Sequence, residues 1–365
     1  MSKDGPSFFD RRVEELEEHG ASVPYAYDDL EEAARDQVPS RAFRHLLATP
    51  GAGETSRANR RFNRWEIVPR VFRDVTDCTL ETSMFGRDVP APVALAPIGR
   101  QQLYHPEGER ASAAAAAELS LPYSLSTVST TSIETVAETM GASPHVFQLY
   151  WAEDWDLTKR LVERAERAGY AAILLTVDFQ ARRWIPEDLA DSDAPRFGTT
   201  NANFVDEPLP EPVYDNTVTW EDLSTLKAWT DLPIYLKGIV HPDDAALATE
   251  YGADGIVVSN HGARQTDGSI GSIGALPDVV DRVDGDIPVL FDGGIRYGAD
   301  IFKTLALGAD GVFIGRPFLL GLAIAGQQGV YETVGNLLAE FESIVGLAGY
   351  TNVTDIDRAT IRRVE

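Results

Sequence analysis

The stretch PVLFDGGIRYGADIFKTLALGADGVFIGRP, residues 288–317, decides the fold class. Its first apolar run, at residues 288–294, is too short for a core helix and does not alternate with polar residues, as in strands buried on both faces of a parallel sheet. A helix-like segment at residues 299–307 ends at a glycine, and a second apolar run begins at residue 311. The stretch therefore predicts one strand–helix–strand unit of a parallel sheet.

The same alternation extends over most of the chain. Eight apolar runs lie at residues 92–99, 123–127, 145–150, 171–178, 233–238, 255–260, 288–294 and 311–317. Helix-like segments between them lie at residues 107–119, 133–140, 156–168, 242–251 and 299–307. Eight such repeats predict an α/β fold of the (β/α)8 TIM barrel type. An open doubly wound sheet is the competing fold, and it is disfavoured because no opening strand carries a G-x-G-x-x-G turn.

Two regions fall outside the repeats. Residues 1–90 are rich in helix-forming residues, and we expect them to form an N-terminal extension before a barrel domain at residues 91–365. The connection after the fourth strand, at about residues 179–218, is long and acidic and contains prolines. Because long connections in compact domains are often lids, we expect this loop to be a mobile cover over the barrel mouth.

Charge restricts the partners and the environment of the protein. The chain has 57 Asp and Glu against 32 Lys and Arg, a net charge of −25, and only five lysines. This acidity argues against nucleic acid and anionic membranes as partners, and it suggests adaptation to a saline cytoplasm. The single cysteine, Cys78, argues against a disulfide scaffold or a cysteine-ligated metal, so no metal is expected. A charged start and no apolar run of about 18 residues predict a soluble, cytoplasmic protein.

Barrel enzymes carry their chemistry at the carboxyl ends of the strands, so the last residues of each run are the candidate site. At the seventh and eighth ends, glycines allow backbone N–H groups to approach an anion, and arginines can add bidentate charge. These residues predict a phosphate cradle, and they are Gly293, Gly294, Arg296, Gly315 and Arg316.

Three other strand ends carry ionisable residues. Lys237 closes an apolar strand in a protein with few lysines, and a buried ammonium calls for an anionic partner. His261 and Arg264 follow the sixth strand, where an imidazole can take a proton while a guanidinium holds a carboxylate. Asp178 ends the fourth strand, and an aspartate facing the histidine would orient its ring.

Taken together, several motifs resemble those of the FMN-dependent 2-hydroxy acid oxidases and dehydrogenases, the glycolate and lactate oxidase group. The motifs are ALAPIG, HPEGE, FQLY, LTVD, LKG, SNHGARQ, FDGGIR and ALGADGVFIGRP, in the order of the family. Within this group APIG, QLYWAEDWDLT and the W-x-P-x-D-L pattern at residues 184–189 are most similar to the lactate 2-monooxygenases.

The resemblance implies an FMN cofactor over the barrel mouth. Residues that the resemblance assigns to the cofactor are Pro97, Ile98, Gly99, Ser126, Gln148, Tyr150, Thr176, Lys237, Ser259, Asp292, Gly293, Gly294, Ile295, Arg296, Gly315 and Arg316. Lys237 is expected near N1 and O2 of the flavin, and the last group, from Asp292 onward, is expected at the phosphate.

The resemblance also implies a reaction. His261 is expected to be the base, Asp178 its partner, Arg264 the anchor of the substrate carboxylate and Tyr150 a hydroxyl donor. A small 2-hydroxy acid would become a 2-oxo acid, or would be oxidatively decarboxylated by a monooxygenase. Oxygen or a carrier would accept the electrons. A homo-oligomer, a tetramer or larger, is expected.

Two positions depart from the family pattern. The family has a tyrosine and a second arginine that bind the substrate carboxylate, and here they correspond to His45 and Ile185. Arg182 or Arg183 could replace the arginine, and His45 could donate a hydrogen bond itself. Two other hypotheses therefore stay open: an FMN-dependent isomerase of the type 2 isopentenyl diphosphate class, and a flavin-binding protein with an altered substrate. Nucleotide dehydrogenases on similar barrels use a catalytic cysteine and are discounted, because Cys78 precedes the first strand.

Overall fold

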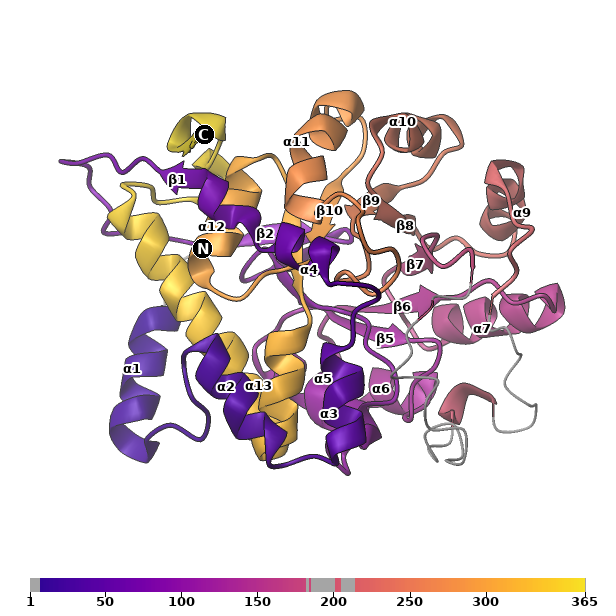
Figure 1. Ribbon diagram of the computed structural model, residues 1–365, viewed down its shortest axis with the longest axis horizontal. Helices are drawn as coiled ribbons and strands as arrows, with labels where there is room; N and C mark the ends of the chain where they lie inside the picture. Colours follow the sequence, from indigo (N-terminus) through magenta and orange to yellow (C-terminus); the bar gives the residue numbers. More distant parts are fainter. Residues whose placement is uncertain (1–6, 182–183, 185–200, 205–213, 365) are drawn as a thin grey trace.

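Eight parallel strands close into a barrel in the computed structural model, which describes residues 7–181, 184, 201–204 and 214–364 (Figure 1). Around the barrel the strands follow one another in chain order, and β11 pairs with β4 to close it. The strands are β4 (Val93–Leu95), β5 (Tyr123–Ser126), β6 (His145–Leu149), β7 (Ile173–Thr176), β8 (Ile234–Ile239), β9 (Gly255–Val258), β10 (Val289–Asp292) and β11 (Gly311–Ile314). Seven strands lie inside a predicted apolar run and β8 ends one residue beyond its run, so the predicted TIM barrel is confirmed.

Helices cover the outside of the barrel. They are α5 (Gly108–Glu118), α6 (Ile133–Met140), α7 (Trp155–Arg167), α9 (Leu223–Lys227), α10 (Pro242–Glu250), α11 (Ser272–Val283), α12 (Gly298–Ala306) and α13 (Arg316–Leu347). Side-chain caps fix two starts, because Ser132 accepts from the N–H of Thr135 and Asp154 accepts from that of Leu157. α13 contains a break at Ala325 and Gly326. Among the helices of the described ranges, none has the length and hydropathy that crossing a bilayer requires.

A short hairpin fills the amino end of the barrel. It consists of β2 (Thr82–Met84) and β3 (Arg87–Val89), which pair antiparallel. Met84 and Phe85 at its turn join the buried cluster inside the barrel, where the Phe85 ring packs edge-on against Tyr235 at 5.0 Å between centroids. With this end filled, the carboxyl ends of the strands remain for a ligand.

The N-terminal segment packs against the end of the chain. Helices α1 (Phe8–His19) and α2 (Tyr27–Arg35) lie beside α13 in Figure 1, and β1 (Trp65–Ile67) pairs with β12 (Ile361–Arg363). A buried ion pair of 2.9 Å joins Arg12 to Glu332 of α13. Helices α3 (Ser40–Leu47) and α4 (Glu54–Asn59) continue towards the barrel. Helices are thus present as expected, while the domain boundary at residue 90 stays a prediction.

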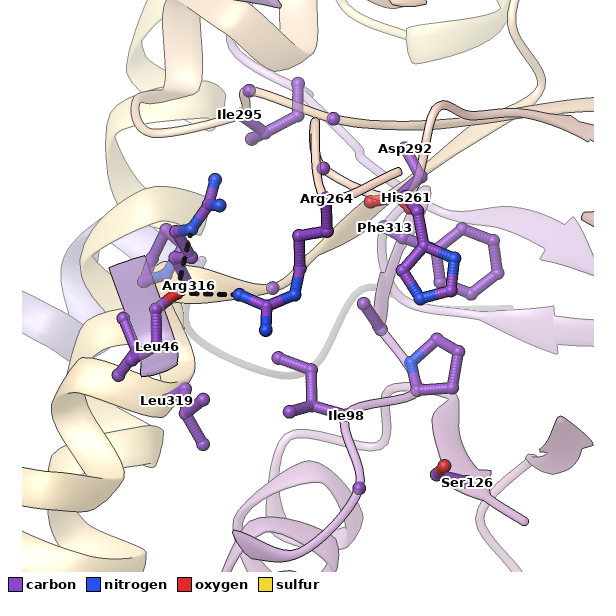
Figure 2. Close-up of a pocket in the computed structure, with 18 of the residues that line it drawn as sticks. Leu46, Ile98, Ser126, His261, Arg264, Asp292, Ile295, Phe313, Arg316 and Leu319 are labelled. Carbon is purple, nitrogen blue, oxygen red and sulfur yellow. Dashed lines mark hydrogen bonds between the residues drawn. The ribbon is translucent and has the colours of Figure 1, made fainter. Parts of the chain in front are cut away.

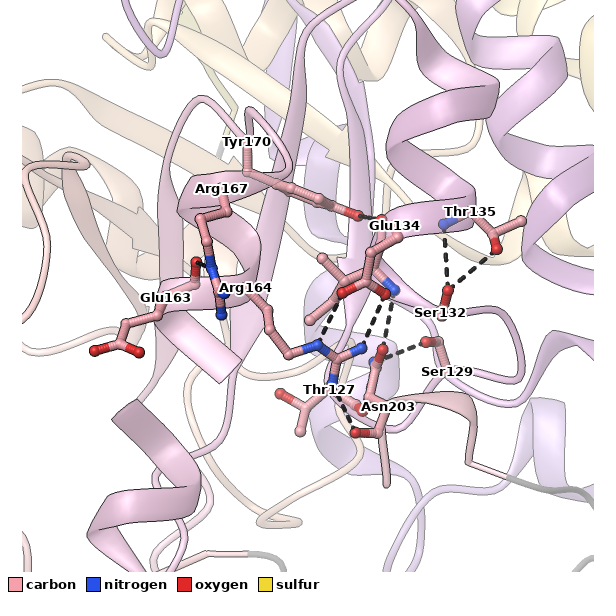
Figure 3. A network of polar contacts seen from close by, with 11 residues as sticks. Thr127, Ser129, Ser132, Glu134, Thr135, Glu163, Arg164, Arg167, Tyr170 and Asn203 are labelled. Atoms are coloured by element: carbon pink, nitrogen blue, oxygen red, sulfur yellow. Dashed lines mark hydrogen bonds and ion pairs between the residues drawn. The ribbon is translucent and has the colours of Figure 1, made fainter. Parts of the chain in front are cut away.

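Most of the predicted lid, residues 179–218, lies outside the described residues, but one short piece is fixed to the barrel. The one-turn helix η3 (Ala202–Phe204) is buried through Asn203. The amide of Asn203 donates to the carbonyl of Thr127 and to Ser129 Oγ, both at 3.1 Å, and accepts from the N–H of Ile133 at 3.0 Å (Figure 3). Arg164 of α7 donates to the Asn203 carbonyl at 2.9 Å. The polar groups of this piece are thus bound and buried, while the lid itself stays a prediction.

Replacing Gly255 by Ala should destabilise the barrel. A Cβ at this position would lie 2.2 Å from Cε1 of Tyr235, whose ring is held by Phe85. Overpacking of this kind typically costs about 1–3 kcal/mol of unfolding free energy, measured here by urea denaturation.

Gly346→Ala is the matched control for Gly255→Ala. A Cβ at Gly346 of α13 meets nothing within 4 Å, so this helical substitution should be neutral or stabilising. Equal stability of the two variants would contradict the close packing of the barrel interior.

Candidate active site

A cavity of about 510 Å³ opens at the carboxyl ends of the barrel strands (Figure 2). Sixteen of the residues singled out in the sequence line it: His45, Pro97, Ile98, Gly99, Ser126, Tyr150, Lys237, His261, Arg264, Asp292, Gly293, Gly294, Ile295, Arg296, Gly315 and Arg316. These residues come from seven strand ends and from α3. The structure thus brings together in one place residues that are up to 271 positions apart, from His45 to Arg316.

A buried charge cluster forms one wall of the cavity. Lys237 Nζ lies 2.8 Å from Asp292 Oδ2 and 3.1 Å from Ser259 Oγ, and Ser259 Oγ donates to the same carboxylate oxygen at 2.8 Å. Burial opposes both charges, but the ion pair outweighs it. The pKa of Lys237 is raised by Asp292 and Asp178, and the pKa of Asp292 is lowered by Lys237 and Ser259. Both side chains are therefore charged around neutral pH.

His261 and Asp178 form a second pair on the same wall. His261 Nδ1 lies 2.9 Å from Asp178 Oδ1. The loop that carries His261 is left-handed at three successive residues, and the N–H of His261 donates to Ser259 Oγ at 3.0 Å. Asp178 reaches the imidazole because Gly238 has no Cβ, which would lie 2.6 Å from Cβ of Asp178. The pair leaves Nε2 of the imidazole as the ring nitrogen not engaged by the carboxylate.

The guanidinium of Arg264, which also lines the cavity, is held by backbone carbonyls of the N-terminal segment. Its Nη1 donates to the carbonyl of His45 at 2.8 Å and to that of Leu46 at 3.2 Å (Figure 2). Its Nη2 lies 3.5 Å from His45 Nε2. The predicted carboxylate anchor and the residue in place of the family tyrosine are therefore neighbours in the cavity wall.

The residues of the predicted phosphate cradle lie together between β10, β11 and α4. Gly293 and Gly294 have φ angles of +119° and +88°, and a Cβ on Gly294 would lie 2.2 Å from the carbonyl oxygen of Asn59. Arg316 at the start of α13 is half-buried, and its Nη2 atom is buried without a hydrogen-bond partner among the described residues. Burial lowers the pKa of Arg316, so the site favours an anion beside it. Close backbone, a helix start and an unsatisfied guanidinium fit the phosphate of FMN.

Hydrogen bonds link the third group of predicted residues along β5, β6 and β7. Ser126 Oγ donates to Gln148 Oε1 at 3.1 Å, and Gln148 Nε2 donates to Thr176 Oγ1 at 3.0 Å. Four predicted residues do not line the cavity but stand behind its wall: Gln148, Thr176, Ser259 and Asp178. Gln148, Ser259 and Asp178 are each hydrogen-bonded to a residue that lines the cavity, and Thr176 is hydrogen-bonded to Gln148. The substrate-binding candidates Arg182 and Arg183 lie outside the described residues, as does Ile185.

Sequence reasoning missed the residues that the N-terminal segment and the long loop supply to the cavity. They are Tyr27, Leu46, Ser56, Asn59, Arg60, Phe179 and Tyr214. Arg60 Nη1 pairs with Asp300 Oδ2 at 2.7 Å, and it also donates to the Gly294 carbonyl. The signal available for Arg60 was the arginine-rich run RANRRFNR, residues 57–64, in a strongly acidic protein.

Replacing Asp292 by Asn should remove several kcal/mol of stability, because the Lys237 ammonium would stay buried without its counter-ion. Breaking a buried pair in this way typically costs about 3–5 kcal/mol. The pKa of Asp292 is lowered from 3.8, so its contribution is present above about pH 4 and is lost as the pH falls. The pKa of Lys237 is raised from 10.5, so its contribution is present below about pH 10 and is lost as the pH rises through the raised pKa.

Urea denaturation of wild type and Asp292→Asn across this pH range measures the effect. The exposed Asp243→Asn is the control and should change stability by less than about 0.5 kcal/mol. An Asp292→Asn variant as stable as the control at pH 7 would show that the pair does not stabilise the fold.

Comparisons with known proteins agree with this geometry. The profile of the family described as FMN-dependent dehydrogenase matches residues 34–363. L-lactate oxidase of Lysinibacillus sphaericus is 41% identical over 360 residues, 93% of each chain. 2-Hydroxyacid oxidase 1 of Homo sapiens is 36% identical over 359 residues, 92% of this chain and 96% of that protein.

A solved structure supports the same relationship. A mandelate oxidase, crystallised with benzoyl-formic acid, is 41% identical and superimposes with a TM-score of 0.86 over 94% of this chain and 99% of that one. The family match at residues 34–363 spans the barrel strands and the loops that carry the site. The chain therefore belongs to the FMN-dependent dehydrogenase family and is an FMN-dependent oxidoreductase of 2-hydroxy acids.

Proposed function

We propose that the preferred substrate is a small, lactate-like 2-hydroxy acid and that its chemistry is carried by His261, Asp178, Arg264 and Tyr150. One observation carries the proposal: the imidazole of His261, which Asp178 contacts from behind, and Arg264 line the same cavity. An imidazole backed by a carboxylate can accept a proton, and a guanidinium can hold the carboxylate of the substrate in bidentate fashion. The imidazole thus suits the hydroxyl-bearing carbon of a 2-hydroxy acid, and the guanidinium suits its carboxylate.

In the proposed reaction each side chain has a separate task. Arg264 holds the substrate carboxylate, and the hydroxyl of Tyr150 donates a hydrogen bond to the bound molecule. His261 takes a proton as C2 is oxidised, and Asp178 stabilises the imidazolium that results. Since Asp178 is in contact with Nδ1, the proton is taken at Nε2.

FMN supplies the chemistry that these side chains lack, because it accepts two electrons from the substrate when bound. The residues proposed to hold it are those of the cradle, with Pro97, Ile98 and Gly99 on the opposite wall. Lys237 supplies a buried positive charge there, kept ionised by Asp292. This charge favours any ligand that gains negative charge in the cavity.

The finer assignments rest on the comparisons and on sequence. We propose oxygen as the electron acceptor, since relatives of this chain are named oxidases. We also propose, from the sequence, that the protein is a cytoplasmic homo-oligomer adapted to salt. Arg182 and Arg183 are proposed to bind the substrate. The named relatives favour the 2-hydroxy acid hypothesis over the isomerase hypothesis, while decarboxylation of the product, as by a monooxygenase, is a further possibility that product analysis decides.

Anaerobic mixing of the FMN-loaded protein with a panel of 2-hydroxy acids, at low and high salt, tests the proposed substrate. Lactate and glycolate should bleach the visible absorption of the flavin, and larger acids such as mandelate should do so more slowly. Oxygen consumption and product analysis then separate an oxidase from a monooxygenase. Failure of every acid in the panel would contradict the proposal and favour an altered substrate.

His261→Gln should leave FMN bound but slow its reduction by substrate about 10²–10⁴-fold, the usual contribution of a general base. Stopped-flow absorbance measures the rate, and dithionite should still bleach the flavin. The control is His241→Asn, which keeps a capping side chain at the exposed start of α10. Loss of FMN from His261→Gln, or an unchanged rate, would show that the role of His261 is misassigned.

His45→Phe should raise KM for the hydroxy acid about tenfold while FMN affinity is unchanged. The imidazole lies beside Arg264, and a lost hydrogen bond to a charged group typically costs about 1.5–3 kcal/mol. His45→Tyr restores a donor and should recover a KM close to that of wild type. Equal KM values for wild type and the Phe variant would exclude a contact between His45 and the substrate.

A further inference from the structure

Tyr27, the first residue of α2, is a buried tyrosine that the proposed chemistry does not use. Its side chain is 2% exposed and lines the cavity beside Arg296 and Arg316. Within the described residues, Tyr27 Oη is buried and has no hydrogen-bond partner. A buried phenol without a partner is costly, so this hydroxyl calls for a ligand or a water molecule.

The groups around this hydroxyl are mainly positive. The Arg296 guanidinium stacks on the Tyr27 ring, 3.8 Å from its centroid. Burial raises the pKa of Tyr27, the charges of Arg296, Arg316 and Arg60 oppose that rise, and Glu31 adds to it. The hydroxyl therefore stays protonated around neutral pH and faces guanidinium groups, which are donors like itself.

Two buried donors in this part of the cavity have no hydrogen-bond acceptor among the described residues. Arg316 Nη2 is also buried without a hydrogen-bond partner among the described residues. The glycine residues of the cradle line the same cavity as Tyr27 and Arg316. A phosphate dianion, with three acceptor oxygens and two negative charges, would satisfy the phenol and the guanidinium together.

We propose that Tyr27 Oη donates a hydrogen bond to the phosphate of FMN, so that the N-terminal segment forms part of the cofactor site. The inference rests on the proposed phosphate cradle and does not depend on which acid is oxidised. It assigns the segment a task in selecting FMN over flavins without a phosphate.

A small void gives the competing explanation. It measures about 10 Å³, and Tyr27, Leu30, Thr333 and Asn336 are among the residues that line it. Thr333 Oγ1 is also buried without a hydrogen-bond partner in the described part of the chain. One water molecule in this void would satisfy both hydroxyls, and Tyr27 would then have no contact with the cofactor.

Titration of the flavin-free protein with FMN and with riboflavin, followed by flavin fluorescence, separates the two explanations. Tyr27→Phe removes only the hydroxyl. It should weaken FMN binding about tenfold or more and leave riboflavin binding unchanged, because riboflavin has no phosphate. Unchanged binding of both flavins, or equal weakening of both, would overturn the proposal.

Tyr170→Phe is the matched control, because it removes another buried tyrosine hydroxyl, one that donates to the Ile133 carbonyl at 3.0 Å away from the cavity. It should not change the ratio of the FMN and riboflavin affinities. Hydrogen exchange on the wild-type protein gives a test that requires no variant. FMN should protect the amides of α2 more than saturating riboflavin does, and equal protection would contradict the proposal.

Discussion

The buried ion pair between Lys237 and Asp292 is the interaction on which the rest of the site depends. Two charges inside a barrel cost several kcal/mol each in lost hydration unless their geometry and hydrogen bonds are good. Here the pair joins β8 to β10, and Ser259, which follows β9 between them, donates to the same carboxylate. Because Ser259 Oγ also accepts from the N–H of His261, the register of three strands fixes the position of the imidazole.

The cationic residues of the cavity explain how a protein of charge −25 can bind an anion. Its cavity gathers Arg60, Lys237, Arg264, Arg296 and Arg316 in one concave surface. Salt screens the attraction between these residues and a bound anion only little, because the charges are close together and partly buried. The repulsion from carboxylates at the surface is screened beyond about 10 Å at 0.1 M salt and beyond about 3 Å at 1 M. A saline medium would thus weaken the repulsion of an anionic substrate more than its binding, consistent with the adaptation proposed from the lysine-poor composition.

The residues at the strand ends could be predicted from the sequence, whereas those of the N-terminal segment could not. Apolar runs mark parallel strands, and the carboxyl ends of these strands must meet, so Lys237, His261 and Asp178 could be predicted from the local pattern. Tyr27, Asn59 and Arg60 could not be found in this way, because nothing local states where the N-terminal helices dock. Their place depends on contacts such as the Arg12–Glu332 pair, which joins residues 320 positions apart.

That docking also shapes the cofactor site itself. The turn at Gly294 can lie against the Asn59 carbonyl only because it lacks a Cβ, so α4 forms one side of the proposed phosphate loop. β1 must meanwhile pair with β12 at the far end of the chain. Closing such a long loop costs chain entropy that only the finished contacts offset. Because a ligand that binds only the folded form adds its binding free energy to stability, FMN held between the N-terminal segment and the barrel would stabilise both together.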